Sequence, residues 1–113
     1  MRFLFLQKPT CSKCKTILAF LTEKIPNQFE TIDYTTTQLK KEKILEVISL
    51  MDKEDLDLVV RRDDFKGQVP TELNALAELL QDPLIMQRPI LVDYEKKKAV
   101  VGRPLERIYD MFK

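Results

Sequence analysis

Residues 2–23 read RFLFLQKPTCSKCKTILAFLTE, a buried-strand pattern followed at once by a helical one. The apolar run that ends at Leu6 is bounded by Lys8 and Pro9, which is typical of a short strand inside a core. From Ser12 to Glu23 the apolar residues follow helical spacing and form one core-facing stripe: Cys14, Ile17, Leu18 and Leu21. The chain therefore begins with a strand that runs directly into a helix, with two cysteines at the junction.

The remainder of the sequence continues to alternate strands and helices. The predicted elements are, in order, a strand over 28–34, a helix over about 38–51, a short helix and a loop within 52–69, a helix opened by Pro70 and ended by Asp82-Pro83, strands over 90–92 and 99–101, and a helix over 104–112. The hydroxyls of residues 35–37, all threonine, are expected to cap the second helix. Pro104 is expected in the first turn of the last helix, and the charged residues 95–98 predict a solvated hairpin tip.

This order of elements predicts the fold class. A β-α-β unit, a helical middle and a β-β-α unit give a thioredoxin-like α/β order, with a mixed four-stranded sheet and a helical insertion over about 37–83. The chain has 113 residues and shows no linker or internal repeat. We therefore expect a single domain over residues 1–113.

Composition excludes several classes of function. Lysine plus arginine number 19 and aspartate plus glutamate 18, so the net charge of +1 gives no electrostatic reason to bind nucleic acid directly or a membrane surface. The absence of histidine excludes a Ser-His-Asp triad, a Cys-His dyad and a histidine-ligated metal. Two cysteines cannot complete a four-ligand zinc site, and two glycines are too few for a phosphate-binding loop. Chemistry must come from cysteine, arginine, carboxylates or backbone amides, and we expect no metal.

The N-terminal segment predicts the compartment. The apolar stretch Phe3–Leu6 ends at Gln7 and lacks both the length and the cleavage site of a signal peptide. No window approaches the ~20 apolar residues of a membrane span. We therefore expect a cytoplasmic protein, in which two cysteines are not expected to serve as a structural staple.

The C-x-x-C sequence formed by Cys11 and Cys14 is the sharpest local motif. Cys11 precedes the first helix, where the helix dipole and unpaired amides stabilise a thiolate, and the neighbouring Lys8 and Lys13 favour the same form. Cys11 is therefore expected to be an exposed nucleophile of lowered pKa. Cys14 begins the buried stripe, so it is either a thiol that resolves a mixed disulfide from below or an inert core residue.

Arginines stand at two other junctions. Arg88 precedes Pro89 at the mouth of the third strand, where thioredoxin-like folds place a cis-proline, and it is then expected to point toward the cysteine. Arg103 lies in a Gly-Arg-Pro sequence where the fourth strand meets the last helix. Arg61 or Arg62 is a weaker candidate, because charged residues usually lie on a solvated face. The alternative for Arg88 and Arg103 is a plain turn position.

Together these segments resemble the ArsC/Spx family, which comprises glutaredoxin-linked arsenate reductases and Spx-type proteins. The resemblance covers essentially the whole chain. Its most specific motifs are Arg88-Pro89-Ile90-Leu91-Val92 and Val101-Gly102-Arg103-Pro104.

The resemblance implies roles for particular residues. In arsenate reductases of this family one cysteine attacks arsenate and three arginines bind the oxyanion. By motif these roles fall on Cys11 and on Arg61 (or its neighbour Arg62), Arg88 and Arg103. Guanidinium groups suit this role because they bind tetrahedral oxyanions through charge-assisted, often bidentate hydrogen bonds.

Two differences separate this sequence from either branch of the family. Arsenate reductases of this type generally have a single cysteine followed by Gly-Thr-Ser or similar, whereas here Ser12-Lys13-Cys14 follows Cys11. A C-x-x-C is typical of the Spx-type branch, whose members are redox-sensing regulators that bind RNA polymerase. Those regulators typically carry a basic extension after the final helix, and this sequence ends on that helix at Lys113.

The interpretation that the resemblance implies is a thiol-disulfide oxidoreductase. It would reduce an oxyanion such as arsenate, or a mixed disulfide, through Cys11, with Cys14 as the resolving thiol and with glutathione, glutaredoxin or thioredoxin as reductant. The arginines would bind the anionic substrate or the carboxylates of glutathione, and no resident cofactor is expected. The first alternative is an Spx-like regulator whose disulfide state controls binding to RNA polymerase. The second is a family member that only binds a thiol or an anion.

Overall fold

A computed structural model describes residues 1–37, 39–59 and 86–113 of the chain. Its elements are β1 (Phe3–Gln7), α1 (Ser12–Lys24), β2 (Phe29–Asp33), α2 (Lys41–Ser49), α3 (Lys53–Leu58), β3 (Ile90–Asp93), β4 (Lys98–Val101), α5 (Glu106–Tyr109) and the 3-10 helix η2 (Asp110–Phe112). The strands form one sheet in the order β2-β1-β3-β4. β1 and β2 are parallel and the other neighbours are antiparallel, so the predicted mixed four-stranded sheet is confirmed.

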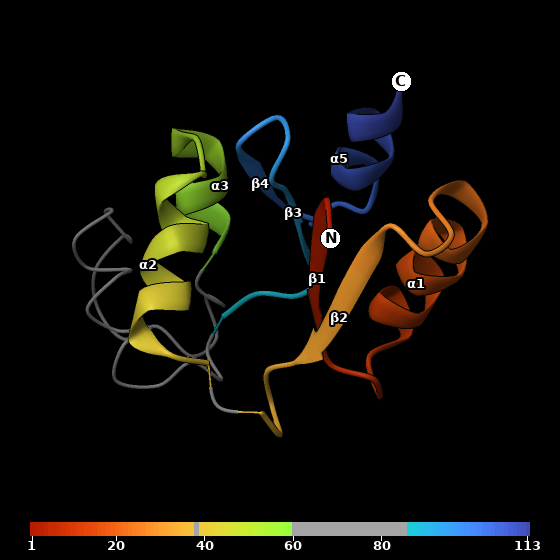
Figure 1. The fold of residues 1–113 in the computed structure, drawn as a ribbon, viewed down its shortest axis with the longest axis horizontal. Coiled ribbons are helices and arrows are strands. Elements are labelled where there is room, and N and C mark those ends of the chain that lie inside the picture. The colour runs from red at the N-terminus through yellow and green to blue at the C-terminus, as the bar shows by residue number, and fades with distance from the viewer. Residues whose placement is uncertain (38, 60–85) are drawn as a thin grey trace.

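Helices cover both faces of this sheet (Figure 1). Successive residues of a strand point to opposite faces, so Phe3 and Phe5 enter one core while Leu4 and Leu6 enter the other. The first core lies under α1 and α5 and includes Ile17, Leu21, Leu91, Val100 and Ile108. The second lies under α2 and α3 and includes Tyr34, Ile44, Val47, Ile48, Val92 and Val101.

The outer edge of β4 is covered by the segment that joins α2 to α3 and by α3 itself. The Ala99 N–H donates to the Leu50 carbonyl at 3.1 Å, and the Val101 N–H donates to Oδ1 of Asp55 at 2.9 Å. Asp55 is fully buried and also pairs with Arg107 of α5 at 2.5 Å. These bonds link α3 on one face of the sheet to α5 on the other face, around the outer edge of β4.

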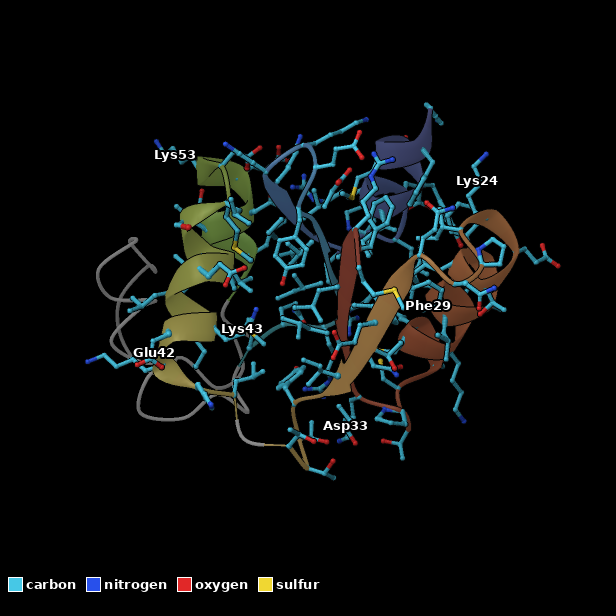
Figure 2. The ribbon with its side chains drawn as sticks, viewed as in Figure 1. Lys24, Phe29, Asp33, Glu42, Lys43 and Lys53 are labelled. Atoms are coloured by element: carbon cyan, nitrogen blue, oxygen red, sulfur yellow. The ribbon has the colours of Figure 1, made fainter. Side chains whose placement is uncertain are left out.

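The loops that carry the candidate residues lie together at one end of the strands. Leu6 pairs with Ile32 and Ile90, and Ile90 pairs with Val101. The carboxyl ends of β1, β2 and β4 therefore meet the amino end of β3. Figure 2 labels Asp33 at the end of β2, beside the loop from β1 to α1. We call this place the cysteine edge and define it by residues 8–11, 34, 86–89 and 102–103.

The observed boundaries correct two predictions. The second helix begins at Lys41 after an N-cap at Lys40 that uses no side chain. The hydroxyls of Thr35 and Thr36 bond to Asp33 instead, because an acceptor two or three residues back holds them in the turn after β2. Pro104 lies in the bend before α5, which begins only at Glu106.

Other sequence predictions either agree with the structure or concern residues that the structure does not describe. Residues 95–98 are all exposed, as expected for a hairpin tip. The helical insertion expected over about 37–83 holds α2 and α3 in its described part, whereas the helix opened by Pro70 lies outside the described residues. No helix in the described ranges is long and apolar enough to cross a membrane.

Candidate functional site

Cys11 caps the amino terminus of α1. Its backbone is extended (φ −80°, ψ 124°), its N–H donates to the Lys8 carbonyl at 2.9 Å and its carbonyl accepts the Lys15 N–H at 3.0 Å. The thiol is partly exposed. The sulfur therefore lies at the positive end of a 13-residue helix, among amides that have no partner within that helix.

The environment of Cys11 favours its thiolate. Burial acts to raise the pKa of Cys11, but hydrogen bonds from the backbone and thiol of Cys14 and from the backbone of Lys13, with the charge of Arg103, outweigh it and lower the pKa. The dominant contributions thus come from amides, a thiol and an arginine that is distant in sequence. The charges of Lys8 and Lys13, which were expected to favour the thiolate, are not among these contributions to the pKa of Cys11. Lys13 is exposed in the first turn of α1, where solvent and salt screen its charge.

Cys14 is a different kind of thiol. It is fully buried below Cys11, in the first turn of α1. Burial, together with the hydrogen bond and the charge of Cys11, raises the pKa of Cys14 to about 11, although the Lys8 backbone and the Arg88 charge act in the opposite direction. Cys14 is therefore a neutral donor to the Cys11 thiolate in the reduced state. The two cysteines are both free in this structure.

Arg103 reaches the cysteine edge from the end of β4. Its Nη2 lies 4.0 Å from Sγ of Cys11, and its Nε donates to the carbonyl of Arg88 at 2.7 Å. Gly102 allows this approach, since a Cβ there would lie 2.6 Å from Ile108 and 3.1 Å from Pro89. The Gly102 N–H donates to the Pro89 carbonyl at 2.8 Å, so this segment and the proline loop are held side by side.

Arg88 approaches Cys11 from the loop before β3. The Arg88–Pro89 peptide bond is cis, the isomer found at this place in thioredoxin-like folds. The residue is 9% exposed, and its Nε has no hydrogen-bond partner among the described residues. Burial acts to lower the pKa of Arg88, but hydrogen bonding and charge from Tyr34 and Cys11 raise it. A buried guanidinium beside a thiolate, with a donor still unused in the described structure, is suited to bind an anion.

Tyr34 belongs to this site and was not found from the sequence. It follows β2, is 2% exposed, and its hydroxyl donates to the Met86 carbonyl at 2.5 Å. The available signal was the parallel pairing of β1 with β2, because it places the residues after both strands at the same edge. The alternation over residues 28–34 predicted the strand but not its neighbour.

Arg61 and its neighbour Arg62 lie outside the described residues. Within the described ranges no group of three or more Cys, Asp or Glu side chains is placed to hold a metal ion. The structure thus brings Cys11, Cys14, Arg88 and Arg103 to one edge, as the sequence predicted, and their chemical roles stay predictions.

Comparison with known proteins identifies relatives in sequence and in fold. No protein-family model matches the sequence. The chain is 29% identical over 100 residues to the global transcriptional regulator Spx from two Streptococcus agalactiae strains, across 83% of this chain and 71% of the relative. Among solved structures, a candidate arsenate reductase from Yersinia pestis is 25% identical, with a TM-score of 0.70 over 96% of this chain and 98% of the other. In sequence and in fold the chain is similar to ArsC/Spx proteins.

A further ArsC/Spx structure shows how closely the fold is shared. The arsenate reductase from Vibrio cholerae superposes with a TM-score of 0.73 at 21% identity, over 96% of this chain and 95% of the other. The thioredoxin-like ArsC/Spx fold predicted from the sequence is therefore confirmed. The two sets of relatives carry different activities in their names, a transcriptional regulator and an arsenate reductase.

Proposed function

We propose that this protein is a thiol-disulfide oxidoreductase that reduces an oxyanion such as arsenate, or a mixed disulfide, through Cys11. The observation that carries the proposal is the pairing of a lowered-pKa thiol at the start of α1 with two converging arginines. A thiolate is the nucleophilic form of cysteine. Arg88 and Arg103 supply the donors that an anionic substrate needs beside it.

The first step is attack of the Cys11 thiolate on the substrate. With arsenate, a sulfur–arsenic bond forms and one oxygen leaves as water after protonation. Arg88 and Arg103 bind the remaining oxygens, and the amino end of α1 adds its positive potential. With a mixed disulfide, the sulfur–sulfur bond of the substrate breaks and its thiol leaves.

The second step uses Cys14. Once the Cys11 sulfur is bonded to substrate, its negative charge and its hydrogen-bond acceptance from Cys14 are lost, and both had raised the pKa of Cys14. Cys14 becomes easier to ionise at the point where its thiolate is required. It attacks the Cys11 sulfur, the two sulfurs form a disulfide, and arsenic leaves with two more electrons as arsenite. Glutathione, glutaredoxin or thioredoxin then reduces the disulfide.

Steady-state arsenate reduction tests this proposal. We expect turnover with glutathione and glutaredoxin or with thioredoxin as electron donor, and loss of turnover in Cys11→Ser. Cys14→Ser, the matched substitution, should keep a slower reaction in which glutathione replaces the second thiol. Absence of arsenate and mixed-disulfide turnover in the wild type, with every donor, would contradict the proposal.

An Spx-like regulator is the second candidate. The C-x-x-C pair and the similarity to Spx support it. In that case the Cys11–Cys14 disulfide would switch binding to RNA polymerase. Co-purification with RNA polymerase that differs between reduced and oxidised protein, without turnover, would favour the regulator over the enzyme.

A further inference from the structure

Tyr34 connects two parts of the cysteine edge that are far apart in sequence. It lies 52 residues before Met86, the acceptor of its hydroxyl hydrogen bond, and the bond is buried. The aromatic ring packs in the core with Leu6 and Ile90. The ring therefore fixes the position of the hydroxyl from below, and the hydroxyl fixes the backbone that leads into Arg88.

The chemistry of the phenol determines what it can offer to Arg88. A tyrosine hydroxyl has one proton and two lone pairs. Its proton is directed to the Met86 carbonyl, so only lone pairs remain for other groups. A guanidinium carries donors only, which makes the Tyr34 oxygen its natural acceptor. The pKa of Arg88 is raised overall: burial acts to lower it, and hydrogen bonding with Tyr34 is the largest contribution that opposes burial.

Arg88 is thus held from two sides. Arg103 Nε binds its backbone carbonyl, and Tyr34 binds both the preceding Met86 carbonyl and the guanidinium. Among the described residues, the contributions that raise the pKa of Arg88 come from Tyr34 and Cys11, and no carboxylate is among them. A carboxylate would neutralise the charge that faces Cys11, whereas a hydroxyl orients it and leaves it positive.

We propose that Tyr34 is a positioning residue that holds the Arg88 guanidinium against Cys11 and thereby sets the reactivity of the thiolate and the affinity of the edge for an oxyanion. This inference deepens the proposed function and depends on it. Tyr34 itself is not placed in contact with the reacting atoms.

The test removes the hydroxyl and keeps the ring. A neutral hydrogen bond contributes a factor of about 2 to 12 in an equilibrium. In Tyr34→Phe we therefore expect iodoacetamide to alkylate Cys11 more slowly at pH 7, by a factor of this size, with the alkylation midpoint at higher pH. Sulfate affinity, measured by calorimetry in a Cys11→Ser background, should fall by a similar factor.

The matched control is Tyr94→Phe. The Tyr94 hydroxyl accepts a hydrogen bond from Lys43 at 3.2 Å, after β3, at the opposite end of the sheet from the cysteine edge. This variant should keep the wild-type alkylation profile and sulfate affinity. It separates the general effect of losing a hydrogen-bonded tyrosine hydroxyl from the effect of losing the Tyr34 hydroxyl.

A double-mutant cycle distinguishes positioning from a general effect on the fold. If Tyr34 acts through Arg88, then Tyr34→Phe should change the Cys11 alkylation midpoint when Arg88 is present and leave it unchanged in an Arg88→Met background. An equal change in both backgrounds, or no change in either, would overturn the inference.

A measurement on the wild type covers the case in which Tyr34→Phe does not fold. With ¹³C-labelled tyrosine, carbamidomethylation of Cys11 should shift the Tyr34 ring resonance and leave that of Tyr94 in place; an unmoved Tyr34 signal contradicts the inference. The two proposals fail differently. A wild-type Cys11 that titrates near the ~8.5 of a free cysteine removes the proposed function, whereas a low wild-type value that survives Tyr34→Phe removes only the role of Tyr34.

Discussion

Two different nitrogens of the Arg103 guanidinium make two different contacts. Nε donates to the Arg88 carbonyl at 2.7 Å while Nη2 faces the Cys11 sulfur at 4.0 Å. A lysine at this position would keep the charge but present one nitrogen in place of a planar fork. It cannot hold the proline loop and face the thiol in the same way.

Arg103→Lys is therefore expected to weaken oxyanion binding. The loss of a hydrogen bond to a charged group corresponds to roughly a ten- to hundredfold lower affinity, measured by calorimetry with sulfate or arsenate in a Cys11→Ser background. Arg2→Lys is the matched control, because Arg2 pairs with Asp93 near the opposite end of the sheet. Equal affinities in Arg103→Lys and the unsubstituted background would leave Arg103 as a turn residue.

At the scale of residues, the sequence predicted what depends on local context. Cys11 and Cys14 stand at a strand-to-helix junction, and Arg88 and Arg103 stand beside prolines at strand ends, so all four could be singled out. The cause of the lowered pKa of Cys11 could not be predicted from the sequence. It depends in part on Arg103, whose guanidinium lies 4.0 Å from the Cys11 sulfur only in the folded chain. Tyr34 was missed for the same reason, since its role depends on a bond to a residue 52 positions away.

At the scale of elements, the hairpin between β3 and β4 is fixed by one buried carboxylate. Asp93 accepts hydrogen bonds from Arg2 and from the N–H groups of Glu95 and Lys96 at 3.0 to 3.3 Å. Burial acts to raise the pKa of Asp93, but these donors outweigh it and hold the pKa below its ordinary value. The hairpin is thus tied to the start of β1 by a group that titrates in acid.

This contact predicts an acid-dependent part of the stability. A carboxyl group whose pKa is depressed in the folded state contributes stability that is present above the unfolded pKa of ~3.9 and is lost as the pH falls through the lower folded pKa. Asp93→Asn should therefore lose less of its free energy of unfolding than the wild type between about pH 5 and pH 2, as measured by urea unfolding across that range. Glu95→Gln, which alters the exposed partner of Arg2, should keep the wild-type pH dependence. If Asp93→Asn shows the same dependence as the wild type, the contact does not contribute in this way.

The elements themselves were largely predictable, and their ends were not. Short apolar runs, one alternating segment over residues 28–34 and period-3.6 patterns located the four strands and the longer helices of the described residues. The start of α2 was placed too early because threonine hydroxyls were assigned to its cap, whereas Asp33 takes them. Which residues a hydroxyl bonds is decided by the turn geometry after β2, and the hydrophobic pattern carries no information on that.

At the scale of the whole molecule, Asp55 joins three elements. From α3 it binds the Val101 N–H of β4 and the guanidinium of Arg107 in α5. Arg107 also pairs with Glu54 at 2.6 Å, but Glu54 is 72% exposed. The sequence did not indicate which of the three acidic residues of α3 would be buried, because that depends on how α3 packs along β4.

We expect Asp55→Ala to be strongly destabilising. Removing one partner of a buried ion pair leaves the other charge uncompensated and costs about 3–5 kcal/mol, and here it also leaves the Val101 N–H without its acceptor. Glu54→Ala removes the exposed partner of the same arginine and should cost under about 1 kcal/mol. The free energy of unfolding from urea titration measures both, and similar values for the two variants would contradict the role given to Asp55.

The covered edge of β4 also limits how copies of this protein can associate. An open strand edge can template the pairing of another chain and so begin aggregation. On β4 the outward amides of Ala99 and Val101 are already bonded to Leu50 and Asp55, so an incoming strand would have to displace α3 before it could pair there. β2 is the other outer strand of the sheet, so charged or proline substitutions intended to suppress pairing between copies belong on β2 rather than on β4.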